Sequence, residues 1–143
     1  STLAKKGISL RIVGSISSDA FSYCLHAGIQ VEHYPIISDD MLAVLYTKSQ
    51  FLFSPSLAEG HNLPIAEALG CGGNVLCSDI PVHREFYNGM VKYFNPHNIE
   101  AMTAAIDAAL EQQNNWNKKN ILHSRSFKDV AADYQALFHA ISN

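Results

Sequence analysis

The sequence has 143 residues, enough for one domain with a core of its own. Its composition, 48% hydrophobic and 16% charged, is typical of a soluble globular protein. The net charge of −3 argues against a broad nucleic-acid-binding surface, and no apolar run is long enough to span a membrane.

Short runs rich in β-branched and aromatic residues predict strands along the chain, and cap residues predict helices between them. The expected strands, in chain order, are 8–13, 29–34, 50–54, 74–78 and 91–94. The expected helices begin at Ser17 or Ser18, Ser38, Asn62 or Leu63, Pro81 and Asn98, and a last helix is expected at about 127–141. This alternation with short connections predicts an α/β domain built on a parallel sheet.

Apolar residues at helical spacing indicate which helix faces turn toward the core. In the helix after Ser38 the expected buried stripe is Leu42, Leu45 and Tyr46. In the helix after Asn98 the expected apolar face is Ile99, Met102, Ile106 and Leu110. The run 50–54 is almost continuously apolar, which is typical of a strand that is covered on both faces.

The stretch Glu59–Glu67 carries the most informative chemistry. It follows the apolar strand and opens a helix, with Pro64 in the first turn. The first N–H groups of such a helix have no internal partner and carry the positive end of its dipole, so the junction suits a phosphate or another anion. The Glu67 carboxylate lies one turn in and leans back toward the same crevice, outside the carboxyl ends of the strands.

The run SPSLAEGHNLPIAEALGCGGNVLCSDI (54–80) resembles the nucleotide-binding signature of retaining glycosyltransferases with the GT-B fold, the glycosyl transferases group 1 family. Seven residues separate Glu59 from Glu67, as in the family pattern, and the similarity covers nearly the whole chain. The resemblance implies a Rossmann-like parallel sheet flanked by helices. Residues 1–143 would form a single donor-nucleotide-binding domain, the C-terminal half of that fold.

Compared with the family pattern, the domain is expected to be incomplete at its N-terminus. The acceptor domain, the first strand and the basic pair that neutralises the donor diphosphate would be absent. Because that strand is central in the family's sheet, we expect a gap or an exposed edge, which invites pairing between chains. The chain is therefore expected either to self-associate or to close its sheet with a changed strand order.

The resemblance implies a glycosyltransferase that transfers a sugar, of the hexosyl or mannosyl type, from a GDP-, UDP- or ADP-sugar to an acceptor hydroxyl. The acceptor would be a glycan or a lipid-linked sugar held by the absent N-terminal domain, so the chain alone is expected to be inactive. No acidic metal-binding pair stands in the loop, and we expect no obligatory metal or other cofactor. Alternatives of the same fold are a non-catalytic nucleotide- or sugar-binding module and a nucleotide-sugar epimerase or hydrolase.

The resemblance also implies a role for each residue of the loop. Glu67 would bind the ribose hydroxyls of the donor, and the catalytic carboxylate Glu59 would contact the donor sugar near its reacting carbon. Backbone N–H groups would be offered to phosphate and sugar oxygens by Gly60, His61, Asn62 and Leu63. The alternatives are a solvated helix residue for Glu67 and a loop carboxylate that caps the next helix for Glu59.

Two more positions match the family pattern with weaker signals. Ile37, after the second strand, matches a position that holds the nucleobase through its backbone, and it is equally well an ordinary loop residue. Glu85 matches a recurrent glutamate, but a surface charge near Arg84 is the simpler interpretation.

The pair His61-Asn62 departs from the commoner Phe-Gly of the family. Asn tolerates left-handed backbone geometry better than most residues, so the loop shape is expected to survive. The odd number of cysteines, without paired spacing, indicates reduced thiols and a cytoplasmic location. The inner face of the membrane is an alternative for the full-length protein.

Overall fold

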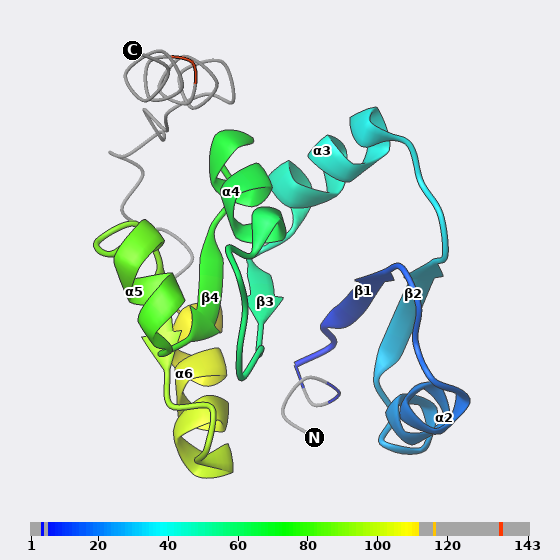
Figure 1. Cartoon of the computed structure of the whole chain (residues 1–143). Coiled ribbons are helices and arrows are strands. Elements are labelled where there is room, and N and C mark those ends of the chain that lie inside the picture. The colour runs from blue at the N-terminus through cyan, green and yellow to red at the C-terminus, as the bar shows by residue number, and fades with distance from the viewer. Residues whose placement is uncertain (1–3, 5, 112–115, 117–134, 136–143) are drawn as a thin grey trace.

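A computed structural model of the chain describes residues 4, 6–111, 116 and 135. Strands and helices alternate throughout (Figure 1). The strands are β1 (Ser9–Val13), β2 (Gln30–Tyr34), β3 (Leu52–Ser54), β4 (Val75–Ser78) and β5 (Lys92–Phe94). The helices are α2 (Ser18–His26), α3 (Asp39–Lys48), α4 (Leu63–Gly70), α5 (Pro81–Tyr87) and α6 (Ile99–Glu111). The helix expected at 127–141 lies outside the described residues.

Local cap chemistry sets the helix starts as the sequence predicts. Ser17, Ser38 and Asn98 each accept a hydrogen bond from the backbone N–H three residues further on, at 3.2, 3.3 and 2.9 Å. Helix α2 is followed by Gly28 at a φ of +69°, a conformation that glycine adopts without a steric penalty. No described helix is long and apolar enough to cross a membrane.

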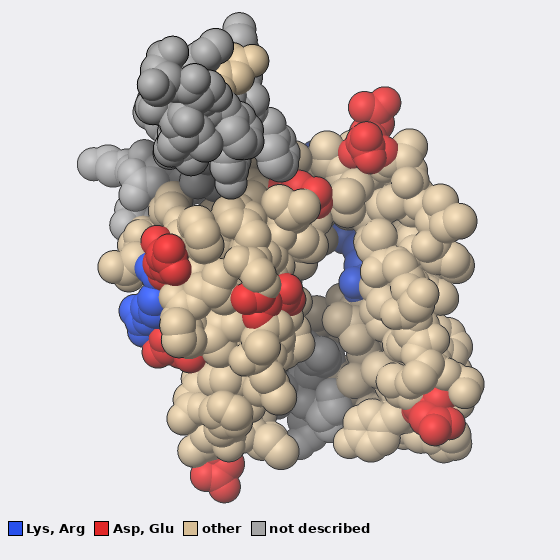
Figure 2. Space-filling model, in the orientation of Figure 1, with Lys and Arg blue, Asp and Glu red and all other residues tan. Residues whose placement is uncertain are grey.

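The strands form two parallel sheets. β1 pairs with β2, with Ser9 opposite Gln30, and the second sheet has the order β3-β4-β5, with Leu76 opposite Lys92. Among the described residues no strand joins β1 to β3, and an opening separates the two parts in Figure 2. The expected gap is therefore present. The alternative, a sheet closed by a changed strand order, is wrong for the described residues, since β1-β2 and β3-β4-β5 form two separate sheets.

We call β1, α2 and β2 (residues 9–34) the N-terminal unit, and β3 to α6 (residues 52–111) the C-terminal unit. Helix α3 follows the N-terminal unit and packs beside α4, at the top of Figure 1. A second connection is ionic: Lys6 Nζ lies 3.4 Å from Asp107 and 3.6 Å from Glu111 on α6. These groups are partly exposed, so this connection adds little to stability.

The core of the described structure lies in the C-terminal unit and at Trp116. One face of its sheet packs against α4 and α5, and the other packs against α6. The buried hydrophobic residues of the two clusters are Ile65, Ala68, Leu69, Val75, Cys77 and Tyr87, and Leu76, Phe94, Ala109 and Trp116. No residue of β1, α2, β2 or α3 is fully buried. The stripe expected on α3 is therefore only partly covered.

The apolar face expected for α6 is right except at its first residue. Met102 and Ile106 pack on the core and Leu110 is buried, as predicted. Ile99 was expected on the same face and is 79% exposed, so that prediction is wrong. Because Asn98 caps the helix, Ile99 is its first residue and lies beyond the part of α6 that faces the sheet.

Candidate functional site

The loop between β3 and α4 starts at the carboxyl edge of the second sheet. Two small polar residues end the neighbouring strands there, Ser54 on β3 and Ser78 on β4, and both are buried. The Ser78 hydroxyl donates a hydrogen bond to the Ser54 carbonyl at 3.3 Å. Parallel strands meet their ligands at this edge, so the predicted loop stands where an α/β fold places a site.

Asn62 is the N-cap residue of α4, in the left-handed conformation at φ 64° and ψ 67°. The expected position of the cap and its left-handed geometry are both confirmed. The side chain, however, makes no cap hydrogen bond and is buried. Its amide Nδ2 donates to Ser54 Oγ at 2.9 Å and lies 3.0 Å from His83 Nε2. The buried side chain of Asn62 thus binds the loop to the end of β3 and to α5.

Glu59 is an exposed carboxylate held by its own loop. Its Oε1 accepts a hydrogen bond from Ser56 Oγ at 2.6 Å and lies 3.4 Å from Asn62 Nδ2. No backbone N–H of a described helix donates to Glu59, so the helix-capping interpretation finds no support among the described residues. No described group donates a hydrogen bond to its Oε2, and the residue is exposed.

Glu67 lies on the exposed side of α4 and contacts the neighbouring helix. Its Oε2 accepts a hydrogen bond from the Tyr46 hydroxyl of α3 at 2.9 Å. Burial, and then the hydrogen bond to Glu67, raise the pKa of Tyr46, so its hydroxyl stays protonated and remains a donor. Among the described residues no lysine or arginine pairs with Glu67.

The residues between the two carboxylates present backbone groups. No described group accepts a hydrogen bond from the N–H of Gly60 or His61, and both residues are exposed. The His61 ring packs on Phe86 of α5, with ring centroids 4.4 Å apart. Leu63 is 52% exposed, at the first position of α4. This arrangement offers N–H donors beside two acidic side chains.

The other two predicted positions are not joined to this loop. Ile37 is partly buried after β2, and no described hydrogen bond links it to α4 or to the loop. Glu85 is exposed on α5. Its neighbour Arg84 binds Asp79 through two hydrogen bonds of 2.6 and 2.7 Å and lies 3.9 Å above the Tyr93 ring. Glu59 and Glu67 thus lie on one loop and on the helix that follows it, and whether Ile37 shares their site stays a prediction.

Three residues beside the site were missed by the sequence reasoning. Tyr46 was assigned to a buried stripe, whereas its hydroxyl reaches Glu67. His83 and Tyr87 lie on α5, are fully buried and contact the loop from the protein interior. The sequence offered one signal for them, a histidine and a tyrosine in the short helix that begins at Pro81. Only the tertiary contacts show which way these two rings point.

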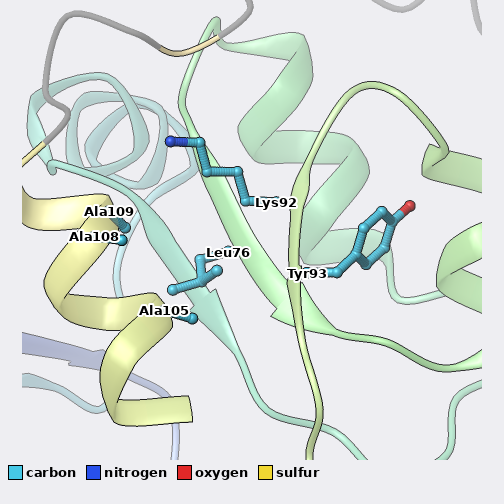
Figure 3. A pocket seen from close by; sticks show the side chains of 6 residues that line it. All are labelled: Leu76, Lys92, Tyr93, Ala105, Ala108 and Ala109. Atoms are coloured by element: carbon cyan, nitrogen blue, oxygen red, sulfur yellow. The ribbon is translucent and has the colours of Figure 1, made fainter. Parts of the chain in front are cut away.

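A hollow of about 300 Å³ lies elsewhere, between β4, β5 and α6 (Figure 3). Its lining is Leu76, Lys92, Tyr93, Ala105, Ala108 and Ala109. The Lys92 ammonium lies 4.3 Å above the Trp116 ring, a cation–π contact. The lining contains no residue of the 55–62 loop and no acid-base pair, so this hollow is separate from the candidate site.

Sequence comparison finds relatives that act on sugars. The family model described as "Glycosyl transferases group 1" matches residues 2–127. The O-antigen chain mannosyltransferase B of Escherichia coli is 30% identical over 88 residues, which cover 62% of this chain and 23% of that protein. The O-antigen chain mannosyltransferase RfbU of Salmonella typhimurium is 36% identical over 70 residues, 49% of this chain and 20% of that protein. The chain thus spans less than a quarter of these curated relatives.

Structural comparison confirms the fold class. A sucrose-phosphate synthase from Thermosynechococcus elongatus superimposes with a TM-score of 0.73 at 18% identity, over 93% of this chain and 38% of that one. The catalytic domain of starch synthase IV from Arabidopsis thaliana, bound to ADP and acarbose, gives a TM-score of 0.68 at 11% identity, over 95% and 33%. At these identities the likeness concerns the fold alone: parallel α/β layers of the GT-B type.

Proposed function

Since the chain belongs to the glycosyl transferases group 1 family, we propose that it forms the donor-binding domain of a glycosyltransferase, which moves a sugar from a nucleotide-sugar to an acceptor hydroxyl. The observation that carries this proposal is the exposed Glu67 carboxylate, which is held by the Tyr46 hydroxyl and paired with no described cation. An exposed carboxylate that a neighbouring hydroxyl already orients suits a ligand with hydroxyl donors.

In this proposal Glu67 binds the ribose of the donor. A carboxylate offers two acceptor oxygens, which suits the adjacent hydroxyls of a ribose. The Tyr46 hydroxyl occupies one lone pair of Oε2 and fixes the side chain, while no described group contacts Oε1. A ligand would therefore meet a carboxylate that is already oriented, which lowers the entropy that binding costs.

The start of α4 binds the diphosphate in this proposal. The N–H groups of Gly60 and His61 have no acceptor in the described structure, and the helix dipole places partial positive charge at this end. Stabilising the negative charge of a departing diphosphate is the main electrostatic task of such a transfer. A basic pair outside this chain would share the task.

Glu59 contacts the transferred sugar in this proposal. The acceptor oxygen forms a bond to the anomeric carbon, the bond from that carbon to the diphosphate breaks, and the departing diphosphate takes up the proton of the acceptor hydroxyl. Retention of the anomeric configuration is the stereochemistry we propose. NMR of the anomeric product made by the full-length protein tests it, and inversion would exclude it.

We propose that the transferred sugar is a mannosyl or another hexosyl group, because the curated relatives are named mannosyltransferases. The carrier is a GDP-, UDP- or ADP-sugar, and no metal is obligatory. We propose that the acceptor, a glycan or a lipid-linked sugar, binds a separate N-terminal domain. A cytoplasmic location, or the inner face of the membrane for the full-length protein, also remains a proposal.

We further propose that the chain self-associates through the open edges of β1 and β3. Each edge presents backbone groups that lack a neighbouring strand in the described structure, and such edges pair readily with other chains. Light scattering over a range of concentrations tests this. A mass equal to one chain at every concentration would exclude self-association.

The donor-binding proposal is tested by calorimetric titration of the chain with GDP, UDP and ADP. We expect weak binding of one of them, and a loss of about tenfold in affinity on Glu67→Ala, in line with a hydrogen bond to a charged group. Glu100→Ala, at an equally exposed glutamate on α6, is the matched control and should bind like the wild type. Equal affinity of the wild type and Glu67→Ala would remove Glu67 from the site.

A further inference from the structure

We propose that His83 and Tyr87 of α5 are positioning residues that hold the loop 59–63 in its donor-binding shape, an inference that rests on the proposed function. Neither residue reaches the exposed face of the loop, because His83 is fully buried and Tyr87 is 1% exposed. Both contact the loop from the interior, one through a side chain and the other through two backbone carbonyls.

The contacts of His83 fix both its own tautomer and the orientation of Asn62. Nδ1 lies 2.8 Å from the Ser78 carbonyl, and a carbonyl only accepts hydrogen bonds, so Nδ1 carries the proton. Nε2 then presents a lone pair, and Asn62 Nδ2 donates to it at 3.0 Å. One buried imidazole thus links the end of β4 to the start of α4.

Tyr87 contacts two consecutive peptide groups, and at Asn62 it acts together with α4, because the Ile65 N–H also donates to the Asn62 carbonyl at 3.1 Å. Its single hydroxyl proton is shared between the His61 carbonyl at 2.9 Å and the Asn62 carbonyl at 3.1 Å. Burial raises the pKa of Tyr87, which keeps this hydroxyl protonated and able to donate. Both carbonyls therefore point inward, toward α5.

The inward carbonyls aim the next two N–H groups outward. In a trans peptide the C=O and the following N–H point in opposite directions, and the described chain contains no cis bond. The N–H groups of Asn62 and Leu63 consequently point away from the Tyr87 hydroxyl. The buried tyrosine, together with the first turn of α4, thus orients the two N–H groups.

Asn62 adopts its left-handed conformation at the cost that a side chain incurs there. Such a conformation persists only where the surroundings hold it. Here the holding groups are Ser54, His83 and Tyr87, which bind its side chain and its carbonyl. Without them the loop is expected to populate other shapes, in which the N–H groups no longer converge.

The test combines loop NMR with nucleotide binding on the chain as it is. Tyr87→Phe removes one oxygen atom, and we expect altered amide signals at Asn62 and Leu63 together with about fivefold weaker binding of GDP, or of UDP or ADP if one of those binds better. Tyr23→Phe is the matched control, since its side chain is 74% exposed on α2 and no described hydrogen bond joins it to the loop. Unchanged loop signals in Tyr87→Phe would overturn the proposal.

The histidine has its own readouts. Nitrogen NMR of the imidazole should show the Nδ1–H tautomer in the wild type, and the Nε2–H tautomer would contradict the proposed link to Asn62. His83→Phe should shift the same loop signals and weaken binding. In the double variant with Asn62→Gly the histidine change should add little, because its partner is already gone. Additive losses would overturn the link.

The two proposals fail in different ways. If the wild type binds none of the three nucleotides while Tyr87→Phe still shifts the loop signals, the positioning of the loop stands and the proposed function falls. If nucleotide binds but neither Tyr87→Phe nor His83→Phe changes the loop signals, the proposed donor site is retained and the positioning role is excluded.

Discussion

The N-terminal and C-terminal units have the same strand-helix-strand pattern but differ in what stabilises them. All fully buried residues between 6 and 111 belong to the C-terminal unit or to the loops within it. The N-terminal unit has one two-stranded sheet, one helix and no buried residue. Parallel strands are normally covered on both faces and flanked by neighbours, so this unit depends on contacts outside itself.

The difference teaches that the candidate site and the stable core belong to the same unit. The loop with Glu59, its internal support from α5 and the helix with Glu67 all lie within residues 52–111. The N-terminal unit reaches this region through α3, whose Tyr46 binds Glu67. Four experiments probe how unequal the two units are.

The largest effect is expected from the core of the C-terminal unit. Leu76 is 1% exposed within the second cluster, so Leu76→Ala should lower the free energy of unfolding by about 3 kcal/mol. Ile12→Ala, in the partly exposed β1, should cost ~1 kcal/mol. Urea unfolding measures both. Equal losses would mean that the N-terminal unit has a core comparable with that of its neighbour.

The next effect concerns the junction of α3 with the C-terminal unit. A Cβ at Gly73 would lie 2.8 Å from the Tyr46 carbonyl oxygen and 3.0 Å from that of Ala68. Gly73→Ala should therefore cost about 2 kcal/mol, because two backbone segments must shift. Gly70→Ala, where nothing lies within 4 Å, is the control and should be neutral or slightly stabilising in thermal unfolding. A neutral Gly73→Ala would show that α3 is free to move off α4.

A smaller effect is expected from the hydrogen bond between α3 and the site. Tyr46→Phe removes the donor to Glu67 and should cost ~1 kcal/mol, with a severalfold loss of nucleotide affinity. Tyr23→Phe, at a tyrosine that is 74% exposed on α2, should change neither quantity. If Tyr46→Phe binds nucleotide as tightly as the wild type, the contact of α3 with Glu67 does not contribute to the function of the site.

The smallest effect is expected within the N-terminal unit and depends on pH. The hydrogen bond from Arg11, and then that from Tyr34, hold the pKa of Glu32 below its ordinary value of 4.5. Because the folded pKa is lowered, the stabilisation is present above the unfolded pKa and is lost as pH falls through the folded pKa. Glu32→Gln should therefore be slightly less stable than the wild type at neutral pH and equal to it in strong acid. A difference that persists in strong acid would point to packing instead.

The sequence predicted the elements well because their signals are local. Ser17, Ser38 and Asn98 act within their own helix turns, so their roles are independent of the rest of the fold. The division into two sheets was predicted only as a gap, since strand pairing depends on distant residues. Ile99 shows the limit of periodicity, which does not reveal how far a helix extends past the sheet that it covers.

The candidate site was predicted where its chemistry is carried by a contiguous motif. Glu59, Asn62 and Glu67 lie within nine residues of chain, and the structure keeps them on one loop and helix. The partners of these residues come from other elements, Tyr46 from α3 and His83 from α5. Such contacts have no sequence spacing to follow and need the tertiary structure.

The bond between Asn62 and His83 also constrains how these two positions evolve. A change to glycine at 62 keeps the backbone shape but leaves the imidazole nitrogen without its donor, while an apolar residue at 83 removes one of the acceptors of the Asn62 amide. Either single step passes through a less stable intermediate. Lineages should therefore exchange the two residues as a pair, and homologues with a glycine in the loop should carry a non-polar residue at the α5 position.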